Sequence, residues 1–170
     1  MHKKVKFTIF RTKWGYFGLS ATGNGLLRTC LPLARREKVE SQLLRNLPDS
    51  QYDKALFKSA QERITAYFEG DYVDFRDIPI ALNGSGAFTK RVLAACRGIK
   101  FGQTVSYGRL AEMAGKPAAA RAVGGVMAKN PLPLIIPCHR VICADGTLGG
   151  FSAMGGVNLK KRLLKLEGQL

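Results

Sequence analysis

The stretch around which this chain is organised is Ile135-Ile136-Pro137-Cys138-His139-Arg140-Val141. A short apolar run interrupted by prolines is typical of a buried strand or extended segment, so Cys138 is expected in the interior rather than at a loop tip. A thiol is a weak nucleophile until it loses its proton, and a neighbouring imidazole is the usual group that removes it. The pair predicts a nucleophilic cysteine, and the alternative is a packed core cysteine beside a surface histidine.

The charge of the chain is strongly positive. The formal net charge is +15 over 170 residues, and the segment 86–170, which holds Cys138, contains 13 Lys and Arg against 3 Asp and Glu. Such a field favours a polyanionic partner, and nucleic acid fits better than an anionic membrane surface. A hydrophobic content of 46% is ordinary for a globular chain with one or two small domains.

The cysteines and histidines do not indicate a metal site. Four cysteines and two histidines show no spacing typical of zinc, so no metal is expected. The pattern is that of a reduced, intracellular protein, which we expect in the cytoplasm, or in the nucleus of a eukaryote. No stretch approaches the about 18 consecutive apolar residues of a membrane span, and no signal-peptide core follows Met1, so no membrane association is expected.

The first eighty residues predict a small antiparallel sheet with helices. Between Val5 and Pro32, short runs rich in Val, Phe, Ile and Thr alternate with turn residues, which is typical of strands joined by tight turns. Helical spacing of apolar residues follows at 34–47 and 53–69. The segment 77–87 is loop-like, so we expect a linker there and domains at 1–80 and 81–170. The acidic residues of this region are expected to be solvated loop charge rather than a metal cluster: Asp71, Asp74 and Asp77.

The C-terminal domain is predicted to be mainly helical, which makes the fold class α/β (α+β). Helices are expected over 88–99, from Ser106 or Thr104 to Gly115, over 118–129 and over 157–167. The second and third are joined by a Gly-containing turn, the pattern of a helix-turn-helix. The helix over 118–129 is rich in Ala and Gly, which favours close approach to a minor groove. For Gly124 and Gly125 we expect that the small residues instead allow tight helix packing within the protein.

These residues together resemble a known family. The run Pro137–Val141, preceded by Arg121–Gly125 and Asn130–Pro131, is similar to the signature of the O6-alkylguanine-DNA alkyltransferases, also called methylated-DNA–protein-cysteine methyltransferases. The close match runs from about Phe88 to Gly168. The resemblance implies irreversible, single-turnover transfer of an alkyl group from O6-alkylguanine in double-stranded DNA to a cysteine, with O4-alkylthymine as a second candidate substrate. It also implies a monomer that needs no cofactor.

The resemblance further implies roles for individual residues. Cys138 would be the alkyl acceptor, His139 the base that deprotonates it through a water, and Glu167 the carboxylate that orients the histidine. Asn130 would brace the site, and Tyr107 would donate to N3 of the guanine. The implied pocket and lid residues are Val141, Ser152, Pro133, Gly149, Phe151 and Lys160. The implied DNA contacts are Arg121, which takes the place of the flipped-out nucleotide, and Thr89, Ala119, Ala120 and Lys129.

The chemistry of the residue types agrees with these roles. Neighbours in an extended segment point to opposite faces, so we expect His139 to reach Cys138 through a water. A base edge inside a duplex must be flipped out before it can react, and an inserted arginine offsets part of the lost stacking. Two other classes stay open. One is a non-catalytic alkyltransferase-like damage sensor, in which another residue replaces the cysteine, and the other is a cysteine-dependent hydrolase, which would turn over.

The segment that would form the lid departs from the family pattern. Ala153 and Met154 stand before Gly155-Gly156 as a two-residue insertion, and Phe151 stands where a tyrosine is common. Cys143 lies close in sequence to the predicted acceptor. It is a candidate for a second, slower acceptor, but we expect it to be packed.

Overall fold

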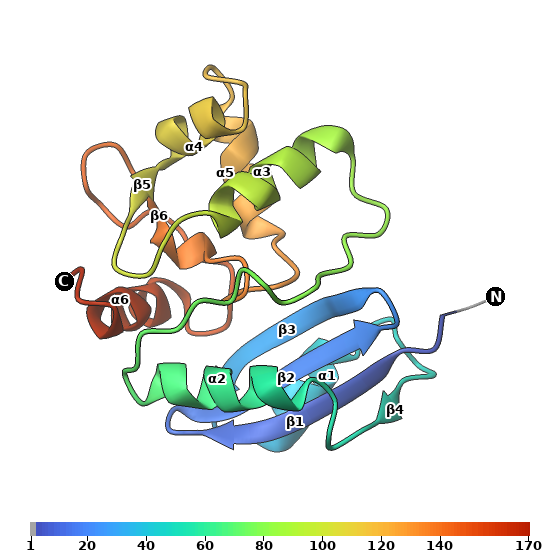
Figure 1. The fold of residues 1–170 in the computed structure, drawn as a ribbon. Helices are drawn as coiled ribbons and strands as arrows, with labels where there is room; N and C mark the ends of the chain where they lie inside the picture. The colour runs from blue at the N-terminus through green and yellow to red at the C-terminus, as the bar shows by residue number, and fades with distance from the viewer. Residues whose placement is uncertain (1–2) are drawn as a thin grey trace. The chain divides into compact units, whose positions relative to one another are not determined.

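The computed structural model describes residues 3–170, which form two compact units (Figure 1). The first unit ends at Leu82 and the second spans Asn83–Leu170, so the boundary lies within the segment 77–87 predicted as a linker. Over residues 3–170, no helix combines the length and the apolar character that crossing a bilayer requires.

The first unit contains a four-stranded sheet in the order β3-β2-β1-β4. The strands β1 (Lys6–Thr12), β2 (Gly15–Thr22) and β3 (Gly25–Leu33) are antiparallel neighbours, which confirms the predicted strands and turns. The short β4 (Gln51–Tyr52) pairs parallel to β1, so the sheet is mixed rather than purely antiparallel. Two exposed residues carry no periodic signal, and β4 could therefore not be predicted from the sequence.

Two helices cover opposite faces of this sheet (Figure 1). On one face, α1 (Arg36–Leu43) packs so closely on β2 that a Cβ at Gly18 would lie 2.6 Å from Cγ1 of Val39. On the other, the ring of Phe17 lies 6.1 Å from that of Phe68, in α2 (Lys58–Phe68). Since neighbouring residues of a strand point to opposite faces, Phe17 faces α2 and Gly18 faces α1.

The helix predicted over 53–69 begins later than expected. The carboxylate of Asp53 accepts a hydrogen bond from the backbone amide of Ala55 at 3.1 Å, and Phe57 adopts a left-handed conformation with φ 51°. An aspartate turn of this kind competes with helix formation, so the first helical residue is Lys58.

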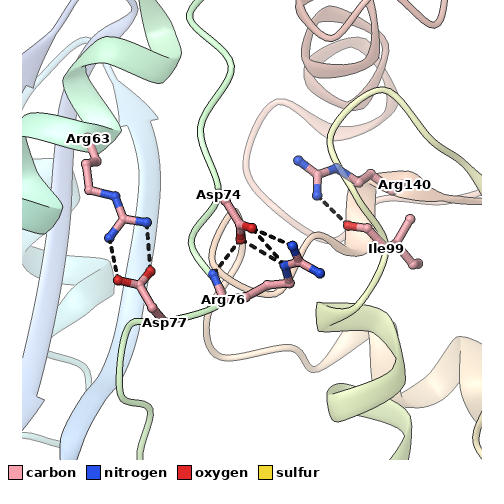
Figure 2. Close-up of polar contacts among 6 residues, drawn as sticks. All are labelled: Arg63, Asp74, Arg76, Asp77, Ile99 and Arg140. Atoms are coloured by element: carbon pink, nitrogen blue, oxygen red, sulfur yellow. Dashed lines mark hydrogen bonds and ion pairs between the residues drawn. The ribbon is translucent and has the colours of Figure 1, made fainter.

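Two of the three aspartates of the following loop, Asp74 and Asp77, form ion pairs with arginines (Figure 2). Asp74 lies 2.6 Å from Nη2 of Arg76, and Oδ1 of Asp77 lies 2.8 Å from Nη2 of Arg63. Among residues 3–170, no group of three or more His, Cys, Asp or Glu is arranged to hold a metal ion.

The second unit is mainly helical, as predicted. Its elements are α3 (Ala87–Arg97), β5 (Val105–Ser106), α4 (Tyr107–Met113), α5 (Ala120–Ala128), β6 (Val141–Ile142) and α6 (Gly156–Leu166), and β5 pairs parallel to β6. Of the two predicted caps for α4, Ser106 is the one observed, because its hydroxyl accepts from the amide of Arg109 at 3.0 Å. Gly115, with φ 82°, ends the first member of the α4–α5 helical pair.

Candidate active site

The segment that leads from α5 to Cys138 is held by the side chain of Asn130. Its Nδ2 donates to the carbonyl of Ile136 at 2.8 Å, and its Oδ1 accepts from the amide of Leu132 at 3.0 Å. The apolar residues of this segment are buried, as predicted: Leu132, Leu134, Ile135 and Ile136. Asn130 thus satisfies backbone groups inside the protein that would otherwise have no partner there.

Cys138 does not lie on an extended segment, and this part of the prediction is wrong. Residues Cys138–Arg140 form one turn of 3-10 helix, η1, which begins after Pro137. A proline cannot donate to a strand ladder, so strand pairing is disfavoured at this point. Because successive residues of a 3-10 helix are rotated by about 120°, Cys138 and His139 still point in different directions. Cys138 is 7% exposed and His139 is fully buried.

Glu167 joins η1 to the end of α6, where it is the C-cap residue. Its Oε1 lies 2.8 Å from Nε2 of His139, and its two oxygens accept hydrogen bonds from Nη2 and Nε of Arg140 at 2.8 and 2.9 Å. The Nδ1 atom of His139 is buried and makes no hydrogen bond to any described residue. The structure therefore brings together His139 and Glu167 beside Cys138, and adds Arg140, to which the sequence assigned no role.

The electrostatics of this cluster follow from burial and from these contacts. Burial raises the pKa of the Cys138 thiol, while a hydrogen bond from Asn130 and the charge of Lys160 oppose the rise. Burial lowers the pKa of His139, although Glu167 acts in the other direction. Burial alone would raise the pKa of Glu167, but the hydrogen bonds from His139 and Arg140 outweigh it and bring this pKa to about 2. At neutral pH the site holds a thiol, a neutral imidazole and a carboxylate.

Lys160 anchors the loop after β6 to α6. The side chain is fully buried, and its Nζ donates to the carbonyls of Val141, Leu148 and Gly150 at 2.6, 2.5 and 3.3 Å. It also lies 5.7 Å from the ring centre of Tyr107. Three carbonyl partners satisfy all three donors of an ammonium group, so Lys160 holds the loop rather than offering a free charge to a ligand.

Tyr107 stands at the start of α4 and faces the same loop. Burial raises the pKa of its hydroxyl, so the group is protonated at neutral pH and can donate a hydrogen bond. At Gly149, with φ 71°, a Cβ would lie 3.1 Å from Sγ of Cys143 and 3.3 Å from the Tyr107 ring. Cys143 is half-buried against these groups.

A cavity of about 360 Å³ opens beside Cys138. It is lined by Tyr107, Gly124, Met127, Ala128, Cys138, Gly150, Phe151 and Ser152. Four of the residues expected in the pocket or its lid do not line this cavity: Pro133, Val141, Gly149 and Lys160. Lys160 and Gly149 nevertheless contact residues that do line it. The sequence analysis did not predict that Gly124, Met127 and Ala128 of α5 line the cavity. The small residues of this helix were the only feature of the sequence that could have indicated it.

The expectation of tight helix packing at Gly124 and Gly125 is wrong. A Cβ at either position would meet nothing within 4 Å, so neither glycine makes room for a neighbouring helix. Gly124 lines the cavity and Gly125 is exposed. Of the expected DNA contacts, Arg121 and Lys129 are exposed at the two ends of α5, Ala119 and Ala120 are half-buried at its start, and Thr89 is half-buried in the first turn of α3.

Known proteins resemble this chain in sequence and in fold. Residues 87–169 match the family described as 6-O-methylguanine DNA methyltransferase, DNA binding domain. The methylated-DNA–protein-cysteine methyltransferase of Mycobacterium tuberculosis is 44% identical over 115 residues, which cover 68% of this chain and 67% of the relative. The protein of the same name from Cricetulus griseus is 36% identical over 176 residues, covering 97% and 83%.

Solved structures agree with these relatives. The O6-methylguanine methyltransferase of Mycobacterium tuberculosis superposes with a TM-score of 0.77 at 35% identity, covering 96% of this chain and 92% of the other. A Mycobacterium tuberculosis structure in complex with DNA gives a TM-score of 0.77 at 34% identity, with 95% and 92% covered. The signature around Cys138, the α/β fold and these relatives lead to one conclusion: this chain belongs to the methylated-DNA–protein-cysteine methyltransferase family.

Proposed function

We propose that this protein repairs O6-alkylguanine in double-stranded DNA by transferring the alkyl group irreversibly to Sγ of Cys138. The observation that carries the proposal is the position of Cys138, a buried thiol on the wall of a cavity of about 360 Å³ and next in sequence to the buried His139–Glu167 pair. A cavity of this size lies at the lower end of the range for small-molecule sites, about 300–1,000 Å³, which suits a single flipped-out base.

The first step is loss of the thiol proton. Because Nε2 of His139 is directed to Glu167, Nδ1 is the ring atom left to accept a proton. The two side chains point in different directions from η1, so a bridging water carries the proton from Cys138 to Nδ1. The nearby charge of Lys160 favours the thiolate that results.

The second step is transfer of the alkyl group. The bond between Sγ and the alkyl carbon forms as the bond from that carbon to O6 breaks, and the electron pair stays on the guanine. The hydroxyl of Tyr107, protonated and on the cavity wall, donates to N3 and stabilises the developing negative charge. Phe151 and Ser152 also line the cavity and would hold the base in place.

Access to the base requires that it leaves the duplex. The α5 helix, with Gly124 and Ala128 on the cavity and Arg121 exposed in its first turn, presents a surface of small residues that suits a minor groove. Arg121 would fill the space of the extruded nucleotide, while Thr89 and Lys129 would contact the backbone. The positive charge of the chain contributes to attraction of the phosphates.

The thioether product explains why each protein molecule would react only once. A thioether has no hydrolytic exit comparable to that of an acyl-enzyme, so each molecule would react once, as a monomer and without a dissociable cofactor. O4-alkylthymine is a second candidate substrate.

Mass spectrometry of the intact protein tests this function. After mixing with a duplex that contains one O6-methylguanine, we expect a gain of one methyl group, mapped to Cys138 and ending at one equivalent. Tight binding without a mass gain would support the damage-sensor alternative instead. Restored guanine with unmodified, recycling protein would support a turnover enzyme and would contradict the proposal.

A further inference from the structure

Arg140 holds the Glu167 carboxylate through a two-point contact that the proposed mechanism does not use. Its Nε and Nη2 donate to the two oxygens of Glu167 at 2.9 and 2.8 Å. Its Nη1 donates to the carbonyl of Ile99 at 2.6 Å (Figure 2), and its guanidinium lies 5.9 Å from the ring centre of Phe101. Arg140 is only 6% exposed. A fork of this kind fixes both the charge and the orientation of the carboxylate.

The same carboxylate oxygen serves two donors. Oε1 of Glu167 lies 2.8 Å from Nη2 of Arg140 and 2.8 Å from Nε2 of His139. An arginine in a protein stays charged and has no acceptor, so the guanidinium can only donate. Since the carboxylate is ionised, the imidazole nitrogen that faces it is best satisfied by carrying a proton, which leaves Nδ1 as the unprotonated ring atom.

The charge of the cluster also depends on Arg140. Within the hydrogen-bonded group of Arg140, Glu167 and His139, a neutral His139 leaves no net charge, whereas a protonated His139 would add an excess charge where solvation is poor. The titratable and charged groups that face His139 are Glu167 and Lys160 from α6 and its C-cap, and Arg140 and Cys138 from η1. The positive charge of Lys160 raises the penalty for protonating the ring.

We infer that Arg140 is the positioning residue that keeps Glu167 ionised and His139 neutral, and so keeps Nδ1 free to accept the proton of Cys138. The inference rests on the proposed transfer to Cys138. Without Arg140, the negative charge of Glu167 would lose its directly bonded cation, and the hydrogen-bonded pair of His139 and Glu167 would bind one further proton. A proton on His139 would occupy Nδ1, and a proton on Glu167 would be donated to Nε2 and move the ring proton to Nδ1. Either arrangement removes the acceptor.

Nitrogen NMR of the imidazole tests the inference without relying on activity. The chain has two histidines, His2 and His139, so a His2→Gln background leaves one imidazole. We expect a neutral ring with its proton on Nε2 at neutral pH. Arg140→Met should convert it to the charged ring or to the form protonated on Nδ1, and Arg140→Lys should restore the original form in part. A charged or Nδ1-protonated ring with Arg140 intact would overturn the inference, even if no variant folds.

Arg91→Met is the matched control, because it removes one arginine from the same unit. Nε of Arg91 donates to the carbonyl of Ala114 at 3.3 Å and is not bonded to Glu167. The ring of His139 should be unchanged in this variant. A change of ring form equal to that of Arg140→Met would mean that net charge, rather than the two-point contact, is responsible, and would overturn the inference.

The pH dependence of methyl transfer supplies the functional measurement. We expect Arg140→Met to slow transfer at neutral pH on the order of a hundredfold, at the lower end of the range for lost general-base catalysis, and to regain rate as the pH rises and the extra proton leaves. If Arg140→Met lowered the transfer rate by the same factor at every pH and left the protonation of the ring unchanged, the role of Arg140 would be structural and the inference would be overturned. Failure of the unaltered protein to transfer any methyl group would instead refute the proposed function and leave the NMR result valid.

Discussion

Nε2 of His139 lies 2.8 Å from Oε1 of Glu167, and both side chains are buried. The contact joins η1 to the end of α6 and fixes which ring nitrogen of His139 carries the proton. The same carboxylate affects the stability of the fold in acid, because the folded state favours the ionised form of Glu167.

His139→Phe should slow methyl transfer from duplex DNA by about 10²–10⁴-fold, the usual range for general acid–base catalysis. The reason is that burial raises the pKa of Cys138, so the thiol does not ionise without a base. Single-turnover kinetics at several pH values measure the loss. Affinity for the duplex should stay close to that of the unaltered protein, and an unchanged rate would show that His139 is not the base.

Glu167→Gln should remove part of the acid sensitivity of folding. The pKa of Glu167 is about 2 in the folded protein against an ordinary value of 4.5, so the unfolded chain binds this proton more tightly. The resulting stability is therefore present above about pH 4.5 and is lost as the pH falls toward about pH 2. Urea unfolding at several pH values measures it, and the difference in the free energy of unfolding should amount to about 3 kcal/mol at most. An identical acid dependence in the two proteins would contradict the assignment.

Cys138→Ala should abolish methyl transfer and leave binding to methylated duplex largely intact. Only the acceptor sulfur is lost, while Asn130 and Lys160 keep their contacts with the surrounding backbone. Intact-mass measurement and a binding titration check the two parts. Cys143→Ser is the matched control and should still gain one methyl group. Methyl gain by the Cys138→Ala protein would identify Cys143 or another residue as an acceptor.

Arg121→Ala should slow repair of duplex DNA much more than reaction with free O6-benzylguanine, because only the duplex requires an inserted side chain. Lys129→Ala is a matched control at the other end of α5, since it removes the same charge from an exposed position. Its effect should appear mainly as weaker binding that depends on salt. Equal losses by Arg121→Ala on the duplex and on the free base would exclude a flipping role.

Gly124→Leu should slow reaction with free O6-benzylguanine at least tenfold, because the new side chain would occupy the cavity beside Cys138. Gly125→Leu places the same side chain on the next, exposed residue and should leave this rate unchanged. Both changes replace a helical glycine with a better helix former and should stabilise the fold by up to about 1 kcal/mol, so unfolding cannot explain a difference between them. Thermal unfolding and rate measurements on the pair decide the matter.

Much of the fold was predictable because local patterns report on burial. The alternation and turns of β1–β3, the apolar spacing of α3 and α6, and the apolar run before Cys138 each reflect which side of a segment faces the core. Predictions failed where a local polar contact or a very short element decided the conformation. The Asp53 turn shortened α2, and Pro137 led into a 3-10 turn instead of an extended segment.

The sequence by itself determined the family and most of the longer helices and strands, and it predicted the roles of Cys138, His139 and Glu167, since a motif and its spacing are properties of the chain. Only the tertiary structure decided that Arg140 and His139 share one oxygen of Glu167, and that Gly124, Met127 and Ala128 form a wall beside Cys138. These contacts join residues from separate elements. Their geometry depends on how helices pack around the core, which no periodicity within a single segment encodes.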